Sequence, residues 1–76
     1  MKITYDKSVD AVYIYLISND DIKPAWVQKT YPCDPSEVGG MINLDFDKDG
    51  HLGGVEILDA SKTLPKELLD SAEIIG

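Results

Sequence analysis

The sequence contains no arginine, and cysteine and histidine each occur only once. Its seven basic residues are all lysines, spaced singly against fourteen Asp and Glu residues, which gives a formal charge of −7. Nucleic acids and anionic membranes attract basic stripes, so the composition argues against both and favours a basic protein partner. The lone cysteine, Cys33, cannot form an internal disulfide, and no His/Cys cluster offers a structural zinc site.

Long hydrophobic runs are also missing. The longest apolar run covers residues 11–17, well below the roughly 20 residues that a membrane-spanning helix requires. Polar and charged residues follow the first few positions, so we recognise no apolar core of a signal peptide. We therefore expect a cytoplasmic protein, in keeping with the scarcity of cysteine.

The length of 76 residues predicts a single domain that spans residues 1–76. A chain of this size buries only roughly 60% of the surface that its unfolded form exposes, so its core is small. With neither a disulfide nor a metal to support it, association with a second copy is the remaining common source of stability. We expect a homodimer.

Alternating apolar and polar residues predict five strands, at about residues 3–5, 11–17, 26–31, 41–46 and 52–58. The period then changes. Apolar residues recur at helical spacing from Leu64 to Ile75, and they predict one helix over about residues 65–72. That helix is too short to be stable alone and must pack on the sheet. The predicted fold is α+β: an antiparallel meander of four to five strands with one C-terminal helix on one face.

The strand predicted at 11–17 is apolar on both sides, which is typical of a central strand covered on both faces. Val12 and Ile14 point one way, while Tyr13 and Tyr15 point the other. One short helix can cover only one sheet face. We therefore consider Tyr13, Tyr15 and Trp26 to be candidates for an interface with a protein partner or a second copy.

Residues 45–56 match the sequence pattern of an EF-hand calcium loop. Asp45, Asp47 and Asp49 occupy the first, third and fifth positions, Gly50 the sharp turn, and Glu56 the twelfth position that closes the oxygen ring. Calcium binding through these four acidic residues is one hypothesis for function.

A β-hairpin is the competing interpretation of the same residues, and we favour it. An EF-hand loop lies between two helices, whereas strand-type alternation precedes and follows this segment. Residues 47–50 form a good type I turn, with Gly50 at the position that needs a positive φ. Gly53 and Gly54 in the following strand indicate a bulge that resets the register.

Catalytic chemistry has little support in the sequence, and we assign no catalytic residue and no cofactor. The only histidine, His51, lies beside the predicted turn, and Cys33 has no cationic neighbour in sequence to activate it. The alternative function is a small hydrolase or ligand-binding protein that uses clustered carboxylates. Its candidate residues are Asp45, Asp47, Glu56 and Asp59.

Four segments of the chain resemble a family of small bacterial proteins, the domain of unknown function 2283. They are ITYD at 3–6, DAVYIYL at 10–16, LDFDKDG at 44–50 and VEILDAS at 55–61. The resemblance implies a compact β-rich domain without an established activity, and no functional residue is carried over. Some members lie beside genes for small toxin-like proteins, which implies an antitoxin-like binding role.

The chain departs from the family pattern at residues 23–39, a longer stretch that holds Cys33 and three of the four prolines. Features particular to this protein are expected there. Taken together, the sequence favours a homodimeric, non-catalytic protein-binding module that uses sheet aromatics and acidic residues to engage its partner.

Overall fold

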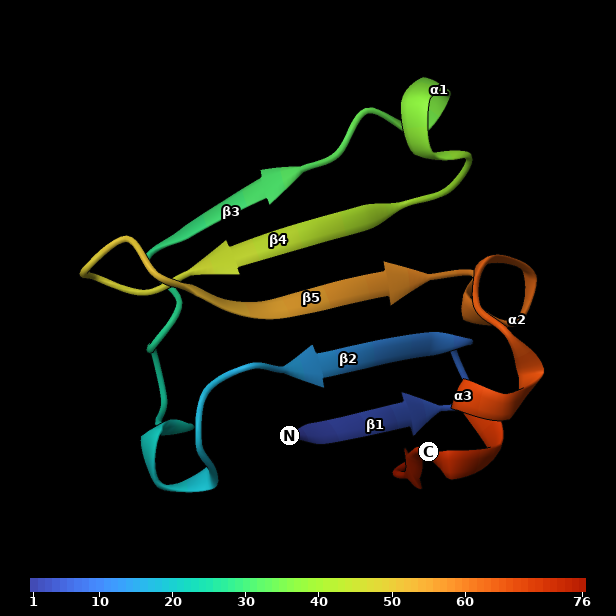
Figure 1. Cartoon of the computed structure of the whole chain (residues 1–76), viewed down its shortest axis with the longest axis horizontal. Helices are drawn as coiled ribbons and strands as arrows, with labels where there is room; N and C mark the ends of the chain where they lie inside the picture. The colour runs from blue at the N-terminus through green and yellow to red at the C-terminus, as the bar shows by residue number, and fades with distance from the viewer.

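The computed structural model describes residues 1–76 as one α+β unit, in which a six-stranded mixed sheet is accompanied by short helices (Figure 1). The strands are β1 (Lys2–Asp6), β2 (Ala11–Tyr15), β3 (Lys29–Pro32), β4 (Ile42–Phe46), β5 (Leu52–Leu58) and β6 (Glu73–Ile74). The helices are the 3₁₀ helix η1 (Asn19–Asp21) and the α-helices α1 (Pro35–Val38), α2 (Ala60–Thr63) and α3 (Lys66–Ser71). None of them is long and apolar enough to cross a membrane.

The strand order across the sheet is β3-β4-β5-β2-β1-β6, so the predicted meander is wrong. The β1–β2 and β4–β5 hairpins are present, but β2 pairs with β5 instead of with β3. The reason is the connection over residues 16–28, which carries the chain past β5 and β4 to the far edge (Figure 1). β2 is a central strand, as its two apolar faces predict.

The C-terminal segment also differs from the prediction of a single helix. The helix predicted over residues 65–72 is present as α3, but an additional short helix, α2, precedes it. After α3 the chain forms β6, which pairs in parallel with β1 through Thr4 and Tyr5. Ala72 has an extended backbone conformation, with φ of −75° and ψ of 153°, and this ends α3. Ile75, which fits the helical spacing, therefore lies beyond the helix, and its N–H donates to the carbonyl of Tyr5.

The core lies on one face of the sheet and is small. Val12 and Ile57 are direct cross-strand partners that are only 1% and 3% exposed, and Ala60 of α2 completes the buried cluster. Leu64, Leu68 and Leu69 from the C-terminal segment pack against this cluster. The predicted packing of C-terminal helix residues on one sheet face is thus observed, and the extents of 32 × 29 × 18 Å reflect a sheet with one thin layer on it.

A network around Asp10 anchors the start of α2 to the β1–β2 turn. The Asp10 carboxylate accepts hydrogen bonds from the backbone N–H and the hydroxyl of Ser61, at 3.0 and 2.7 Å, and from the Tyr5 hydroxyl at 2.8 Å. The Asp10 carbonyl accepts from the Ala60 N–H at 2.9 Å. These bonds lower the pKa of Asp10, the Ser61 hydroxyl contributing most and the Tyr5 hydroxyl next.

Shortening the most buried isoleucine tests the importance of the core. We expect Ile57→Val to lower the free energy of unfolding by about 0.5–1.5 kcal/mol, because it removes one methylene from a packed site. The same change at Ile75, which is 59% exposed, is expected to stay within about 0.5 kcal/mol. Urea denaturation of the two variants measures both values, and equal effects would contradict this position of the core.

Substituting Asp10 tests the anchor of α2. We expect Asp10→Asn to lower the melting temperature at neutral pH, since the variant loses the charge but keeps a residue that tolerates the φ of 53°. The folded-state pKa is lowered, so the stabilisation is present above the unfolded value of about 4 and is lost as the pH falls through the folded value.

The difference in melting temperature between wild type and Asp10→Asn should therefore shrink on acidification from about pH 7 to about pH 2. Asp20→Asn, a change at an exposed position in η1, serves as the matched control and should have little effect at either pH. A difference that is independent of pH would show that the carboxylate charge does not anchor α2.

Candidate functional site

The acidic segment 45–56 forms a β-hairpin, which confirms the favoured interpretation of the sequence. The Gly50 N–H donates to the Asp47 carbonyl at 3.0 Å, and the Asp47 N–H donates to the His51 carbonyl at 2.9 Å. Gly50 has the expected positive φ, 83°. The register then shifts after the Asp45–Gly54 pair, so that Phe46 pairs with Leu52, which confirms the predicted bulge at the glycines.

The hairpin separates the four residues that fit the calcium-loop pattern. Asp47 and Asp49 lie in the turn, where their carboxylates and the His51 ring have possible ligand atoms within 4.8 Å of one another. Asp45 and Glu56 lie instead on the sheet, on β4 and β5. The structure therefore does not bring the four carboxylates together around one point.

Asp45 is buried on the sheet face opposite α2 and α3. Its carboxylate accepts hydrogen bonds from the Tyr13 hydroxyl and the Thr30 hydroxyl, both at 2.5 Å, and the residue is only 8% exposed. Burial raises the pKa of Tyr13, and the hydrogen bond to Asp45 raises it further. The Tyr13 ring lies over Gly54, where a Cβ atom would overlap the ring and its hydroxyl.

The same face carries a second polar pair and a second aromatic ring. Asn43 donates to Glu56 at 2.9 Å, and the Tyr13 and Tyr15 rings have centroids 4.5 Å apart. The Lys2 ammonium lies 5.8 Å from the centroid of the Tyr15 ring. We give the name tyrosine face to the part of this side of the sheet that is formed by Lys2, Thr4, Tyr13, Tyr15, Thr30, Asn43, Asp45, Gly54 and Glu56.

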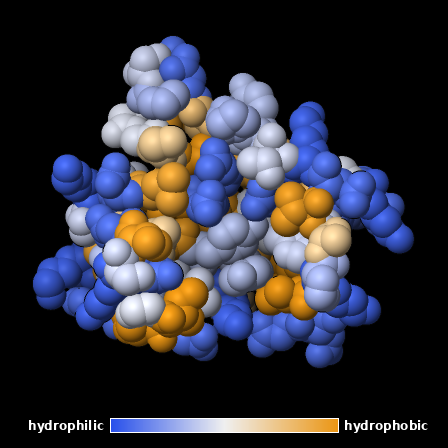
Figure 2. Space-filling view, turned by 180° about the vertical axis from the view of Figure 1, so that it is seen from behind, coloured by the Kyte–Doolittle hydropathy of each residue, from blue (hydrophilic) through white to orange (hydrophobic).

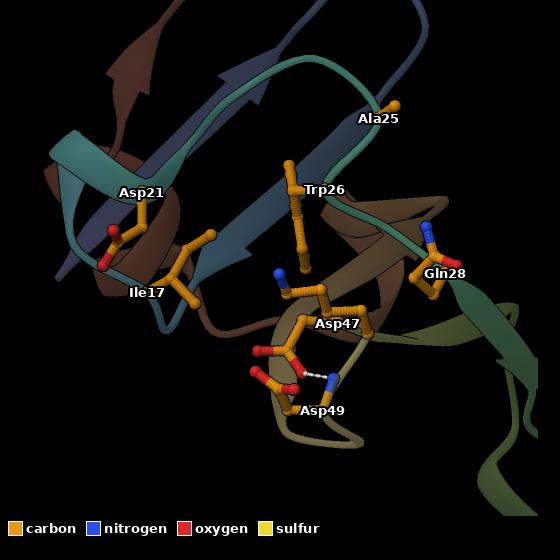
Figure 3. Close-up of a pocket in the computed structure, with 8 residues that line it drawn as sticks. Ile17, Asp21, Ala25, Trp26, Gln28, Asp47 and Asp49 are labelled. Atoms are coloured by element: carbon orange, nitrogen blue, oxygen red, sulfur yellow. Dashed lines mark hydrogen bonds between the residues drawn. The ribbon is translucent and has the colours of Figure 1, made fainter.

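Trp26, the third interface candidate, lies next to the tyrosine face, because it contacts the residue of β5 that precedes Gly54. Its ring packs against Gly53, where a Cβ atom would collide with it, and it borders a pocket of about 360 Å³ (Figure 3). Figure 3 shows the Trp26 ring directed toward the β4–β5 turn, with Asp21 on the other side of the pocket. The pocket is lined by Ile17, Asp21, Ala25, Trp26, Gln28, Asp47, Lys48 and Asp49.

The pocket is negatively charged. Three carboxylates line it, from Asp21, Asp47 and Asp49, against the single cation of Lys48. Asp47 accepts hydrogen bonds from the backbone N–H groups of His51 and Asp49, each at 2.9 Å. These bonds, the one from His51 foremost, lower the pKa of Asp47, so its carboxylate stays ionised at neutral pH.

The remaining sequence candidates lie at separate places. His51 has a highly exposed side chain, with its Nδ1 3.5 Å from the Asp47 carboxylate. Cys33 is a free, half-buried thiol directly after β3. Asp59 is exposed at the start of α2, where it adopts a left-handed conformation with φ of 51°. Neither Cys33 nor Asp59 lines the pocket.

Sequence reasoning missed several residues of both surfaces. Asp21 and Gln28 reach the pocket through the 16–28 connection, and no local pattern connects them with the 47–50 turn. Thr30 and Asn43 join the tyrosine face through strand pairing. The alternation of apolar and polar residues does place Asn43 and Asp45 on one side of their strand. This was the only sequence signal that connected Asn43 with the tyrosine face.

Comparison with known proteins identifies a family. The family described as "Protein of unknown function (DUF2283)" matches residues 2–61, which span all the strands except β6. No curated protein and no solved structure matches the chain. The matched region contains the whole tyrosine face and every residue that lines the pocket.

The separated carboxylates lead to a prediction about calcium. A site with a dissociation constant near 10 μM would stabilise the fold by about 2.7 kcal/mol at about 1 mM calcium. That would raise the melting temperature on the order of 10 °C in so small a domain. We expect no such rise in a thermal melt, because hydrogen bonds hold Asp45 and Glu56 on the sheet. An increase of this size would restore the calcium hypothesis.

Proposed function

The chain belongs to the DUF2283 family, and we propose that it is a non-catalytic protein-binding module that engages a basic side chain of a protein partner. The observation that carries the proposal is the pocket beside the β4–β5 turn. There an aromatic ring and three carboxylates surround one cavity (Figure 3). A pocket of about 360 Å³ is at the small end of the range for ligand sites, as suits a single inserted side chain.

The chemistry of the pocket favours a guanidinium or ammonium group. A cation over the face of a tryptophan ring is stabilised by about 0.5–2 kcal/mol, depending on how far it is desolvated. Carboxylates add charge-assisted hydrogen bonds, which are strongest with the planar guanidinium of arginine. The formal charge of −7 also steers a basic partner toward the chain.

The pocket is partly pre-organised for such a contact. Trp26 is held against Gly53, and Asp47 is fixed by two backbone N–H groups, so neither side chain loses much freedom on binding. Asp21 and Asp49 are exposed at the rim, and the Asp21 carboxylate accepts a hydrogen bond from the Ser18 hydroxyl at 3.0 Å. This arrangement resembles a recognition pocket more than a reaction site.

The alternative of a hydrolase has less support. Five of the eight lining residues are exposed, so the pocket does not exclude water. A carboxylic acid that donates a proton needs a raised pKa, whereas the pKa of Asp47 is lowered. The other proposed carboxylates, Asp45, Glu56 and Asp59, do not line the pocket.

The biological setting of this binding is part of the proposal. We propose that the protein acts in the cytoplasm of a bacterium, where it binds a basic protein in the manner of an antitoxin. The acidic composition agrees with a basic partner. Whatever its role in the cell, the partner contributes an arginine or lysine side chain to the pocket.

The only tryptophan in the chain lines the pocket, so its fluorescence reports on binding directly. We expect a short acetylated and amidated peptide with a central arginine to change Trp26 emission in a saturable titration. A peptide with glutamine in place of the arginine should have no effect. Raising the salt concentration should weaken the response, because the rim carboxylates are exposed.

A pair of neighbouring aspartates provides the matched variants. Asp21 lines the pocket and Asp20 does not, although both are exposed residues of η1. We expect Asp21→Asn to weaken peptide binding about threefold to tenfold, as for a partly exposed ion pair, and Asp20→Asn to leave it unchanged. Equal effects of the two changes, or no fluorescence response to the arginine peptide, would refute the proposed pocket.

A further inference from the structure

Lys48 is the one residue of the pocket whose charge opposes the proposed ligand. It is exposed on the β4–β5 turn and lines the same cavity as the carboxylates of Asp21, Asp47 and Asp49. The ion pairs of the chain are those of His51 with Asp47 and of Lys66 with Asp70, so the Lys48 ammonium is paired with none of these carboxylates. The pocket therefore presents carboxylates and a cation that do not neutralise each other.

We infer that the pocket recognises an arginine that has a carboxylate beside it in the partner, and that Lys48 binds this carboxylate. The carboxylate belongs to an acidic residue near the arginine, or to the end of a chain that terminates in arginine. This specificity rests on the proposed function, because it narrows the ligand of the same pocket from a basic side chain to a pair of opposite charges.

The carboxylates of the pocket leave oxygen atoms free for the guanidinium. Asp47 accepts both of its backbone hydrogen bonds at Oδ1. Asp21 accepts the hydrogen bond of Ser18 at Oδ2. Asp47 Oδ2 and Asp21 Oδ1 therefore remain available. A guanidinium has five N–H donors in one plane, so it can bond to more than one of these oxygens at a time.

Apolar side chains border the same cavity and suit the aliphatic part of an arginine. Trp26 and Ile17 both approach Gly53, where a Cβ atom would lie 2.5 Å and 3.2 Å from them. Figure 3 shows both side chains next to the β4–β5 turn, which carries the charged groups. Long basic side chains bury their methylene groups on apolar surface while the charged end stays with polar partners.

Lys48 discriminates against a ligand that carries positive charge alone. An arginine in the pocket shares the cavity with the Lys48 ammonium, and like charges brought together in this way repel each other. A carboxylate beside the arginine replaces this repulsion with a second ion pair. Specific binding sites commonly combine an attractive contact for one ligand with a repulsive contact against others.

The unpaired state of Lys48 also distinguishes this role from that of an internal competitor. A lysine that blocked the pocket would form an ion pair with one of its carboxylates in the free protein, and Lys48 forms none. Nor does the face drawn in Figure 2 offer a continuous apolar surface, because its hydrophobic residues lie in separate groups among hydrophilic ones. The pattern of charges in the pocket is thus the better-defined recognition feature.

Titrations of Trp26 fluorescence with matched peptides test this specificity. In acetylated and amidated peptides, glutamate is placed at each of the four positions within two residues of a central arginine, and glutamine replaces it in the matched peptide. A peptide that ends in arginine is compared as the free acid and as the amide. These two comparisons separate an acidic side chain from a chain end as the source of the carboxylate.

We expect a peptide with the carboxylate to bind about twofold to fivefold more tightly than its match, as for an exposed ion pair. The overall charge of −7 acts in the opposite direction, because it favours the more basic peptide. Lys48→Met should abolish the preference. Lys7→Met makes the same change of charge at an exposed turn outside the pocket and should keep the preference.

The outcomes separate this specificity from the proposed function. Arginine peptides that bind without any preference for a carboxylate would overturn the role of Lys48 and leave the proposed function intact. A preference that persists in Lys48→Met would do the same. No response to any arginine peptide would refute the proposed function and the role of Lys48 together. Circular dichroism of both variants confirms that each is folded.

Discussion

The contact between Val12 and Ile57 holds the two halves of this chain together. These residues are cross-strand partners on β2 and β5, and they are the two largest hydrophobic side chains in the buried cluster. One hairpin brings β1 to β2, and another brings β4 to β5, so the β2–β5 pairing joins two units that are each marginal alone. Ala60, fully buried beside them, then fixes where the C-terminal helices begin. The sheet face opposite this contact carries polar and aromatic side chains, among them Tyr13 and Asp45.

Local structure could be predicted from the sequence, and the pairing between distant segments could not. The 47–50 turn, the Gly50 conformation, the bulge at the glycines and the bounds of β5 depend on residues close in sequence, whose preferences are strong. The meander failed because alternation says which side of a strand is buried but not which strand lies next to it. β6 was missed for a related reason: Ile75 fits a helical spacing, yet parallel pairing with β1 stabilises an extended chain there.

The family resemblance gains a physical meaning from the structure. The aspartate that opens the DAVYIYL segment is Asp10, and the serine that closes VEILDAS is Ser61. The Asp10 carboxylate accepts hydrogen bonds from Ser61 and from the Tyr5 hydroxyl of the first segment. Residues of three of the four segments thus form one structural anchor, although Ser61 lies 51 positions after Asp10. The contacts of the candidate site, in contrast, depend on which distant segments lie side by side. Tyr13 and Asp45 were singled out separately, but their hydrogen bond follows only from the β2–β5–β4 order, and Asp21 meets Asp47 only through the irregular 16–28 connection.

The pocket and the tyrosine face meet at the pair of glycines in β5, Gly53 and Gly54. The Trp26 ring occupies the space beside Gly53, and the Tyr13 ring occupies the space over Gly54. A side chain at either position would displace one ring, so the glycines serve close approach as well as the bulge. Two adjacent residues of β5 therefore provide the space for both rings, one at the pocket and one on the tyrosine face. A ligand in the pocket that moved Trp26 would act on β5 next to the residue on which Tyr13 rests, and through Tyr13 on its hydrogen bond to Asp45.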